Sequence, residues 1–179
     1  MSWPQGASRD AGQPTALPAA EQPAEHPLDR ALVRAYRHLG QREHSVAEMR
    51  RRLERARTDP EIAEQALAIL SEQGYLDDAR YARMLVEDRR NVDGWGEQRI
   101  RARLQQAGIK RDLIDQALGE GGHAGELAGA IALLQRRWRR APADDRERQR
   151  AFGQLIRMGY ESEVAYEAIR AHERNARSI

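Results

Sequence analysis

The sequence predicts an all-α protein, in which three tandem three-helix repeats form an elongated, curved helical array behind a disordered N-terminal tail. Three observations predict it. Only 5% of the 179 residues are aromatic and 32% are charged, which suits a thin-cored helical protein better than a β-sheet protein. From Leu28 onward, apolar residues recur at the spacing of a helix face. The register of the helices then repeats twice along the chain, as in tandem repeats.

The N-terminal segment, residues 1–26, is expected to be disordered. It is poor in large apolar residues and rich in Pro, Ala, Gln and Gly, a composition that buries too little surface to fold. Prolines would interrupt any helix that started there; they are Pro4, Pro14, Pro18 and Pro23.

The first repeat contains three predicted helices. The first follows Leu28-Asp29. Ser45 is the predicted N-cap of the second, and Glu48 completes the pattern of a capping box. Asp59-Pro60 starts the third, as a cap followed by a first-turn proline. The predicted inward-facing residues are Leu32, Ala35, Tyr36 and Leu39, then Met49, Leu53 and Ala56, then Ile62, Ala66, Ile69 and Leu70.

A stop and restart separates the first two repeats. Gly74 follows an apolar helix and can take the left-handed conformation that ends it. Asp77 is the predicted N-cap of the next helix, and Asp78 suits the positive end of its dipole. Three further side chains are expected to lock the two repeats at a fixed angle: Tyr75, Leu76 and Tyr81.

The repeat is visible at a shift of 51 residues. It aligns Met49, Leu53, Ile62, Ala66 and Leu67 with Ile100, Leu104, Leu113, Ala117 and Leu118, and then with Ala151, Leu155, Val164, Ala168 and Ile169. Gly108 and Gly159 recur in the turn between these helices. Arg57 replaces that glycine in the first repeat, so its turn is expected to differ. The predicted divisions are a tail at 1–26 and repeats at 27–75, 76–121 and 122–179.

The later repeats differ from the first in two predicted loops and in their first helices. The loops cover residues 91–96 and 141–145. In the third repeat the first helix is predicted to face inward through Leu127, Ile131, Leu134 and Trp138.

The sequence offers no pattern of an active site, so we expect a non-enzymatic protein without catalytic residues, metal or cofactor. It has no cysteine, and its five histidines have no metal-ligand spacing. His38 and His44 flank a turn, where surface or capping roles are expected. No apolar run approaches about 18 residues. We therefore expect a cytoplasmic protein without a membrane segment, and a monomer because no dimerisation element is evident.

Arginine is the conspicuous residue type, since Lys110 is the only lysine among 30 basic residues. Arginines gather in the second helix of each repeat and around Trp138, where they could form a basic face for DNA phosphates or an acidic protein groove. A solvated helix face balanced by glutamates, or an arginine-favouring genome, predicts the same pattern. The candidate partner-binding residues are Arg50, Arg51, Arg55, Arg99, Arg101, Arg103, Arg136, Arg137, Arg139, Arg140 and the loop residue Trp95.

The chain resembles the RecX family of recombination regulators over about residues 28–172. The matching residues are Arg42 to Ser45 with Glu48, Met49 and Leu53; the stretch from Gly74 to Ala82; Gly96 with Arg99, Ile100, Leu104, Gly108, Ile109, Ile114, Ala117 and Leu118; and Leu155 with Gly159-Tyr160. Tyr160 stands where the family has Phe, and Arg57 departs from the family's glycine.

The resemblance implies an all-helical regulator that binds the RecA recombinase, typically within the groove of the RecA–DNA filament. It implies restraint of filament growth, ATP hydrolysis, strand exchange and the co-protease activity that triggers the SOS response. The alternative from the residues alone is a helix-turn-helix-like DNA-binding regulator, which should prefer one duplex sequence even at moderate salt. A RecA regulator is instead expected to bind DNA only weakly, without sequence preference and in a salt-sensitive way. A helical scaffold for some other partner also stays open.

Overall fold

The computed structural model describes residues 26–119, 121–138 and 140–177, and within them the chain forms nine α-helices and no strand. The all-α class and the three tandem three-helix units are therefore confirmed. The predicted tail lies outside the described residues except for His26, which caps the first helix. The helices are α1 (Pro27–Leu39), α2 (Val46–Arg55), α3 (Pro60–Glu72), α4 (Asp78–Asp88), α5 (Glu97–Gln106), α6 (Arg111–Gly119), α7 (Gly122–Arg137), α8 (Asp145–Met158) and α9 (Ser162–Arg177).

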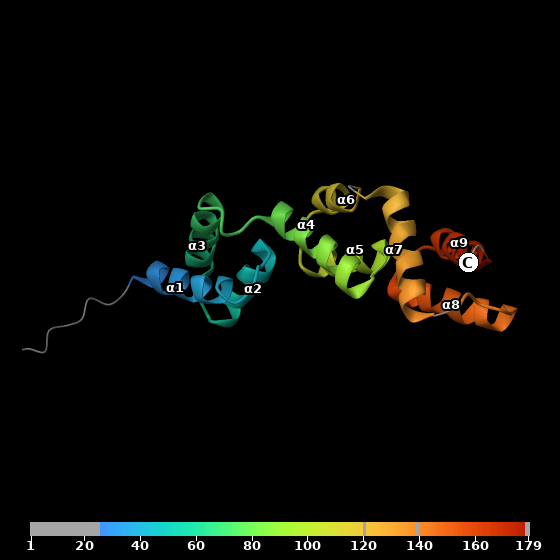
Figure 1. The fold of residues 1–179 in the computed structure, drawn as a ribbon. Coiled ribbons are helices and arrows are strands. Elements are labelled where there is room, and N and C mark those ends of the chain that lie inside the picture. The colour runs from blue at the N-terminus through green and yellow to red at the C-terminus, as the bar shows by residue number, and fades with distance from the viewer. Residues whose placement is uncertain (1–25, 120, 139, 178–179) are drawn as a thin grey trace, which may run out of the picture.

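Three modules follow one another along an extended body (Figure 1). We define the first module as α1–α3, the second as α4–α6 and the third as α7–α9. Each has a separate apolar core, and a core of this size gives only a marginal stability to so small a unit. Contacts between neighbours therefore carry part of the stability, as in other repeat proteins.

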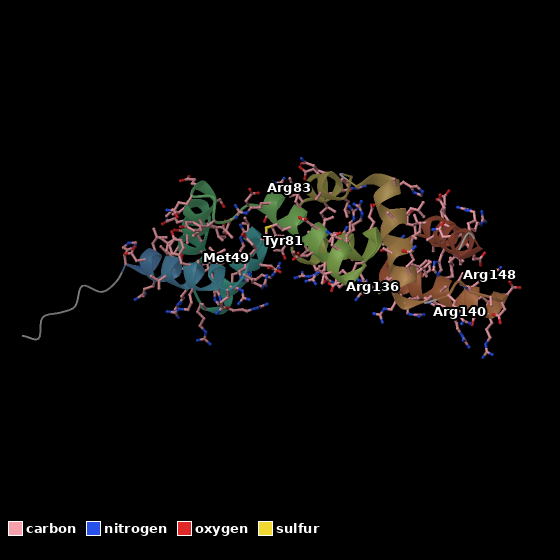
Figure 2. All side chains as sticks on the ribbon, in the orientation of Figure 1. Met49, Tyr81, Arg83, Arg136, Arg140 and Arg148 are labelled. Atoms are coloured by element: carbon pink, nitrogen blue, oxygen red, sulfur yellow. The ribbon has the colours of Figure 1, made fainter. Side chains whose placement is uncertain are left out.

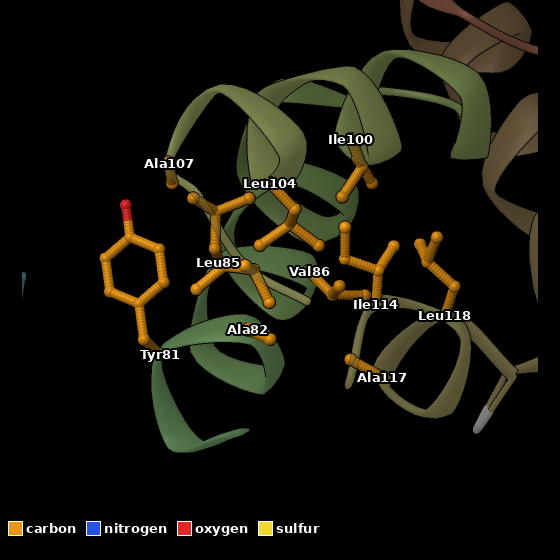
Figure 3. Packing of buried hydrophobic residues seen from close by; sticks show 11 residues of the cluster. Tyr81, Ala82, Leu85, Val86, Ile100, Leu104, Ala107, Ile114, Ala117 and Leu118 are labelled. Carbon is orange, nitrogen blue, oxygen red and sulfur yellow. The ribbon is translucent and has the colours of Figure 1, made fainter. Parts of the chain in front are cut away.

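The repeat predicted from the sequence is confirmed by burial. At matching positions Met49, Ile100 and Ala151 are fully buried, as are Leu53, Leu104 and Leu155 at the next turn. Figure 3 shows Ile100 and Leu104 converging with Val86, from α4, and with Ile114 and Leu118, from α6. Because matching positions are buried in every module, the three helices of each module pack in the same arrangement.

The helices begin where the sequence places their caps. The Ser45 hydroxyl accepts from the Glu48 N–H at 3.0 Å, and the Asp59 carboxylate accepts from Glu61 at 2.9 Å. Asp77 accepts from Arg80 at 2.9 Å and so caps α4. Side-chain acceptors at these positions satisfy N–H groups that lack a partner within their own helix.

The end of α3 also follows prediction, but of the three residues expected to lock the modules only Tyr81 reaches from one module to the other. Gly74 has φ +75°, in the left-handed region that glycine adopts at low cost. Tyr75 packs edge-on against Tyr36 of α1, at a centroid distance of 5.3 Å. Leu76 belongs to the first core, and Tyr81 to the second. Tyr75 and Leu76 thus close the first module, whereas Tyr81 of the second module lies beside Arg42 of the first and lines a shared hollow with it.

The segment after α4 differs from the predicted loop. Residues Arg89–Asp93 continue α4 as a π-helical turn, η1, which ends at Gly94 with φ +67°. The wider turn was not visible in the sequence because no local pattern separates it from a loop.

The turn at Arg57 was expected to differ from its counterparts, and that expectation is wrong. Arg57 has φ +56°, beside +80° for Gly108 and +92° for Gly159. The N–H of the next residue bonds back to Leu53 at 3.1 Å, as it does to Leu104 and Leu155 in the other modules. The hydrogen bonding of the turn and the packing of α2 on α3 hold the arginine in a conformation that glycine prefers.

Arg57→Gly is therefore expected to raise the free energy of unfolding by about 0.5–1 kcal/mol. A left-handed conformation costs a non-glycine residue about 1–2 kcal/mol, of which glycine's larger unfolded-state entropy cancels part. Urea titration followed by circular dichroism measures the change. Arg55→Gly, within α2, is the control and should lower the free energy of unfolding by about 1 kcal/mol. If both variants lost the same free energy of unfolding, the backbone of Arg57 would not be strained.

Candidate partner-binding surface and module joints

The first joint is the contact between the first and second modules. It places the N-terminal end of α2 against the C-terminal end of α5. The buried Ser45 hydroxyl, which caps α2, also donates to the carbonyl oxygen of Ala107, the C-cap of α5, at 2.6 Å. The Val46 N–H donates to the carboxylate of Asp78 at 2.9 Å. Unpaired groups of two helix ends thus satisfy one another, with their dipoles head to tail.

Asp78 has a second role beside the one predicted. It was expected to sit at the positive end of its own helix, and it does lie in the first turn of α4. Its hydrogen bond, however, goes to Val46 in the first module. The two neighbouring acids therefore cap different helices: Asp77 caps α4, and Asp78 caps α2 across the joint.

Glu48 is the ionic centre of the first joint. It accepts from Arg42 at 3.0 Å and, across the joint, from Arg103 of α5 at 3.2 Å. Nδ1 of His44 lies 3.3 Å from the same carboxylate. Burial alone would raise the pKa of Glu48, but the hydrogen bonds from the two arginines outweigh it and lower the pKa below 4.5. The Glu48 carboxylate, predicted to complete a capping box, therefore bonds to Arg42, His44 and Arg103.

His44 is buried, contrary to the surface or capping role expected for it, with only 1% of its surface exposed. Burial first, and then the nearby Arg42, lower its pKa below the usual 6.5, although the hydrogen bond with Glu48 acts in the opposite direction. His44 is therefore harder to protonate in the folded protein than in the unfolded chain.

We expect the stability of the first joint to fall as the pH drops below about 6.5, the unfolded pKa of His44. The unfolded state binds the His44 proton first, which favours unfolding. Glu48 acts at lower pH: its folded pKa is depressed, so its contribution is present above 4.5 and is lost as the pH falls through the folded value. Urea titrations at several pH values measure the slope. His44→Gln should flatten it near pH 6; an unchanged slope would contradict the assignment.

The second joint repeats the first with different residues. The Gly96 N–H, at the N-cap of α5, donates to the carbonyl oxygen of Met158 at the end of α8, at 2.8 Å. Gly96 and Met158 match Ser45 and Ala107 in the repeat register. The Glu97 N–H donates to the buried carboxylate of Glu126 at 3.0 Å, just as Val46 donates to Asp78. Both joints therefore use one design, in which a carboxylate from the next module caps the preceding module's second helix.

Glycines set the closeness of both joints. A Cβ on Gly108 would lie 2.4 Å from the Cβ of Ala47, and one on Gly159 would lie 2.4 Å from the Cβ of Arg99. A Cβ on Gly96 would lie 2.4 Å from the backbone carbon of Gly159. Since real Cβ atoms do not approach so closely, any larger residue must push the modules apart.

Five of the predicted contact arginines are engaged within the molecule. Two brace a second helix against a third: Arg50 with Glu64 at 2.6 Å, and Arg101 with Asp115. Arg101 also bonds to Glu97 of its own helix at 2.9 Å. Three reach across joints: Arg51 to the Gln106 carbonyl at 3.3 Å, Arg103 to Glu48, and Arg99 to the Arg157 carbonyl at 3.5 Å. Sequence spacing does not distinguish such internal arginines from free ones.

The remaining predicted arginines are exposed where the structure describes them. Arg55, Arg136, Arg137 and Arg140 are exposed and make no ion pair with other described residues. Figure 2 shows Arg136 and Arg140 in the part of the molecule formed by α7 and α8, far along the array from α2. Arg139 lies outside the described residues.

Trp95 belongs to the second joint. It packs against the second core, and the guanidinium groups of Arg99 and Arg89 lie 4.1 and 5.2 Å from its ring centroid. A hollow of about 510 Å³ beside it is also lined by Arg136 and Glu126. The structure thus brings Trp95, Arg99 and Arg136 together, and leaves the α2 arginines in the first module.

Glu126 was missed by the sequence argument, although a signal for it exists. Its carboxylate is buried, which raises its pKa, and it caps α5. The alignment of Leu28-Asp29 with Leu76-Asp77, carried one module further, places Glu126 opposite Asp78. This register predicts a shared role for the two acids.

Two kinds of site are absent from the described part of the chain. None of its His, Asp and Glu residues gather in groups of three that could hold a metal ion. Its helices are all too short or too polar to cross a membrane.

Sequence models of three known domains match the chain in order. They are the first, second and third three-helix domains of RecX, at residues 31–70, 77–118 and 125–169. The regulatory protein RecX of Deinococcus radiodurans is 36% identical over 162 residues, which cover 89% of this chain and 76% of that protein. The chain belongs to the RecX family.

Further comparisons agree with the family. The regulatory protein RecX of Trichlorobacter lovleyi is 37% identical over 134 residues, covering 73% of this chain and 87% of the relative. A crystal structure of regulatory protein RecX superimposes with a TM-score of 0.68 at 28% identity, covering 81% of this chain and 72% of that one. RecX from Lactobacillus salivarius has a TM-score of 0.74 at 15% identity, covering 82% and 97%, and shares the fold. The two curated relatives and the first of these structures carry the name regulatory protein.

Proposed function

We propose that this RecX-family chain binds the RecA recombinase within the groove of the RecA–DNA filament, in the cytoplasm and as a monomer. There it restrains filament extension, ATP hydrolysis, strand exchange and co-protease activity, and so modulates recombination, DNA repair and the SOS response. The family supports a regulatory role. The observation that carries the mechanism is the pair of equivalent joints, which fix three modules into one extended body.

An extended and fixed body suits a filament better than a single subunit. It can contact neighbouring RecA protomers at once, and the joints hold its three modules at one spacing. A ligand shifts an equilibrium only through differential affinity. A body that fits one spacing of protomers therefore opposes the rearrangements that extension and ATP turnover require.

We assign the contact face to the exposed arginines Arg55, Arg136, Arg137 and Arg140. Their guanidinium groups are not committed to carboxylates of the described chain and are free to bind an acidic protein surface or DNA phosphates. Binding to bare DNA is expected to be weak, non-specific and strongly dependent on salt. Arg103 and Arg51 act at the first joint, so their replacement would disturb the body before the contact face.

A sequence-specific DNA reader is the poorer proposal for these second helices. A recognition helix of the helix-turn-helix type contacts bases with its N-terminal residues. The N-terminal end of α2 is covered by Ala107 and Asp78, and that of α5 by Met158 and Glu126. A duplex sequence preferred by more than about 1,000-fold over random DNA at physiological salt would favour that reader instead.

The proposed function predicts that the protein inhibits RecA-dependent ATP hydrolysis on single-stranded DNA at less than one molecule per RecA protomer. The double variant Arg136→Glu and Arg137→Glu should need at least about 10-fold more protein for the same inhibition, a change worth about 1.4 kcal/mol. A coupled ATPase assay at fixed RecA and DNA measures both.

Two outcomes separate the parts of this proposal. If the natural protein leaves ATP hydrolysis unchanged at equal amounts of RecA, the function is wrong. If it inhibits but the double variant inhibits equally well, the function stands and the contact face lies elsewhere. Thermal unfolding of the variant, expected to match the natural protein, checks its fold.

A further inference from the structure

One position changes character in the third module. In the first module Arg50 and Glu64 brace the second helix against the third, and Arg101 and Asp115 do so in the second. The repeat register places Phe152 and Tyr166 at this position in the third module. Their rings stack at a centroid distance of 4.6 Å and an interplanar angle of 29°. An ion pair would serve the same bracing purpose, so the aromatic pair is not required by the fold.

The aromatic pair forms part of an open groove on α8 and α9. Its volume is about 360 Å³, and Phe152, Tyr166 and Ile169 provide its apolar surface. Tyr166 is 55% exposed. Tyrosine exposed beside apolar neighbours and arginine is typical of the residues that dominate protein–protein binding energy. The volume lies at the small end of the range of ligand clefts, which suits a side chain better than a folded element.

The charges at the rim favour a partner with a carboxylate. Arg148 and Arg170 line the groove, together with a single acid, Glu173. Glu173 is already bonded to Arg148 at 2.7 Å, and Arg148 also bonds to Asp145 at 2.8 Å. Arg170 is exposed and has no ion pair with another described residue. An incoming carboxylate would therefore find Arg170 available.

The same charges disfavour a nucleic acid. Arg148 is committed to two carboxylates, so Arg170 is the one available cation among the lining residues of this groove. Nucleic-acid grooves instead present rows of uncommitted cations along the backbone path.

We propose that this groove, defined by Phe152, Tyr166, Ile169 and Arg170, docks an apolar side chain of RecA that has a carboxylate beside it. The apolar side chain packs on the aromatic pair and the carboxylate pairs with Arg170. The proposal rests on the proposed function, and it makes the third module an anchor of the protein on its partner. The matching positions of the first two modules, closed by ion pairs, offer no such apolar surface.

The test transplants the brace of the second module into the third. Phe152→Arg with Tyr166→Asp recreates the pair seen at Arg101 and Asp115, which this fold accommodates. Affinity for RecA filaments preassembled on fluorescently labelled single-stranded DNA should fall at least 10-fold. Tyr166→Ser and Arg170→Glu, made separately, should each weaken binding in the same direction. Tyr75→Ser is the matched control, because Tyr75 is 50% exposed in another aromatic pair, and its affinity should not change.

Parallel measurements identify any other occupant. The mass from sedimentation velocity should be the same for the natural protein and every variant, and binding to bare single-stranded DNA should be the same for the natural protein and the variants that keep its net charge, Phe152→Arg with Tyr166→Asp and Tyr166→Ser. A loss confined to bare DNA would overturn the proposal in favour of a nucleic acid, and a dimer of the natural protein that the variants abolish would overturn it in favour of a second copy. If the folded variants bound filaments as tightly as the natural protein does, the groove would not be the docking site, and the proposed function would stand. Failure of the natural protein to bind RecA filaments would instead refute the proposed function.

Discussion

Gly96→Ala is expected to open the joint between the second and third modules and to lower the free energy of unfolding by about 2–3 kcal/mol. The added Cβ would lie 2.4 Å from both the Gly159 carbonyl carbon and the Tyr160 nitrogen. These are backbone atoms at the end of α8, which cannot move aside as a flexible side chain would. Gly96 itself has φ −80°, so alanine brings no backbone strain there, and the whole effect is the collision across the joint.

Urea titration and small-angle X-ray scattering measure the two parts of this effect. Scattering should give a broader distribution of distances, because the third module loses its fixed position while its own core stays intact. Gly125→Ala is the control, since nothing lies within 4 Å of its added Cβ in α7. That change should stabilise the protein by about 1 kcal/mol, as glycine is a poor helix former. Equal stability of Gly96→Ala and the natural protein would show that the joint yields freely.

Ser45→Ala is expected to lower the free energy of unfolding by about 2–4 kcal/mol, more than the loss of an ordinary helix cap. One hydroxyl accepts from the Glu48 N–H and donates to the Ala107 carbonyl in a buried setting. Loss of the cap costs about 1 kcal/mol. An unsatisfied buried carbonyl adds about 1–3 kcal/mol.

Asp59→Ala provides the comparison for Ser45→Ala. Asp59 caps α3 at an exposed position and makes its cap bonds to Glu61 and Ile62 of its own helix. Its loss should cost about 1 kcal/mol, the value of a cap alone. Chemical unfolding of the two variants under one condition gives the difference, which is the contribution of the joint. Equal costs would mean that the Ala107 carbonyl finds water in the variant.

The local features of the fold were predictable because their causes are local. Ser45, Asp59 and Asp77 cap helices with their own side chains, and Gly74 ends α3 through its own backbone. The spacing of apolar residues likewise indicates most of the buried helix faces, although Tyr36 and Ala56, predicted to face inward, are exposed. Arg57 shows the limit of such reasoning, since packing and turn hydrogen bonds override its backbone preference.

The joints were less predictable because their partners are far apart in the chain. Asp78 satisfies a group of α2, and Glu126 a group of α5; neither pairing leaves a mark in local spacing. The same is true of Arg103: its spacing within α5 is that of a surface arginine, and only the packing of α2 against α5 reveals its bond to Glu48. Among the predicted contact residues, the structure therefore separates the arginines that hold modules together from those that remain exposed, a distinction that charge alone does not make.

RecA-dependent ATP hydrolysis on single-stranded DNA, measured with Gly96→Ala beside Gly125→Ala, tests most directly the claim that a fixed three-module body restrains the filament. Gly125→Ala should inhibit as the natural protein does. Gly96→Ala should retain three folded modules, seen as native helix content, yet require at least about 10-fold more protein for half inhibition. Full inhibition by a Gly96→Ala protein whose scattering shows a loosened second joint would contradict the claim.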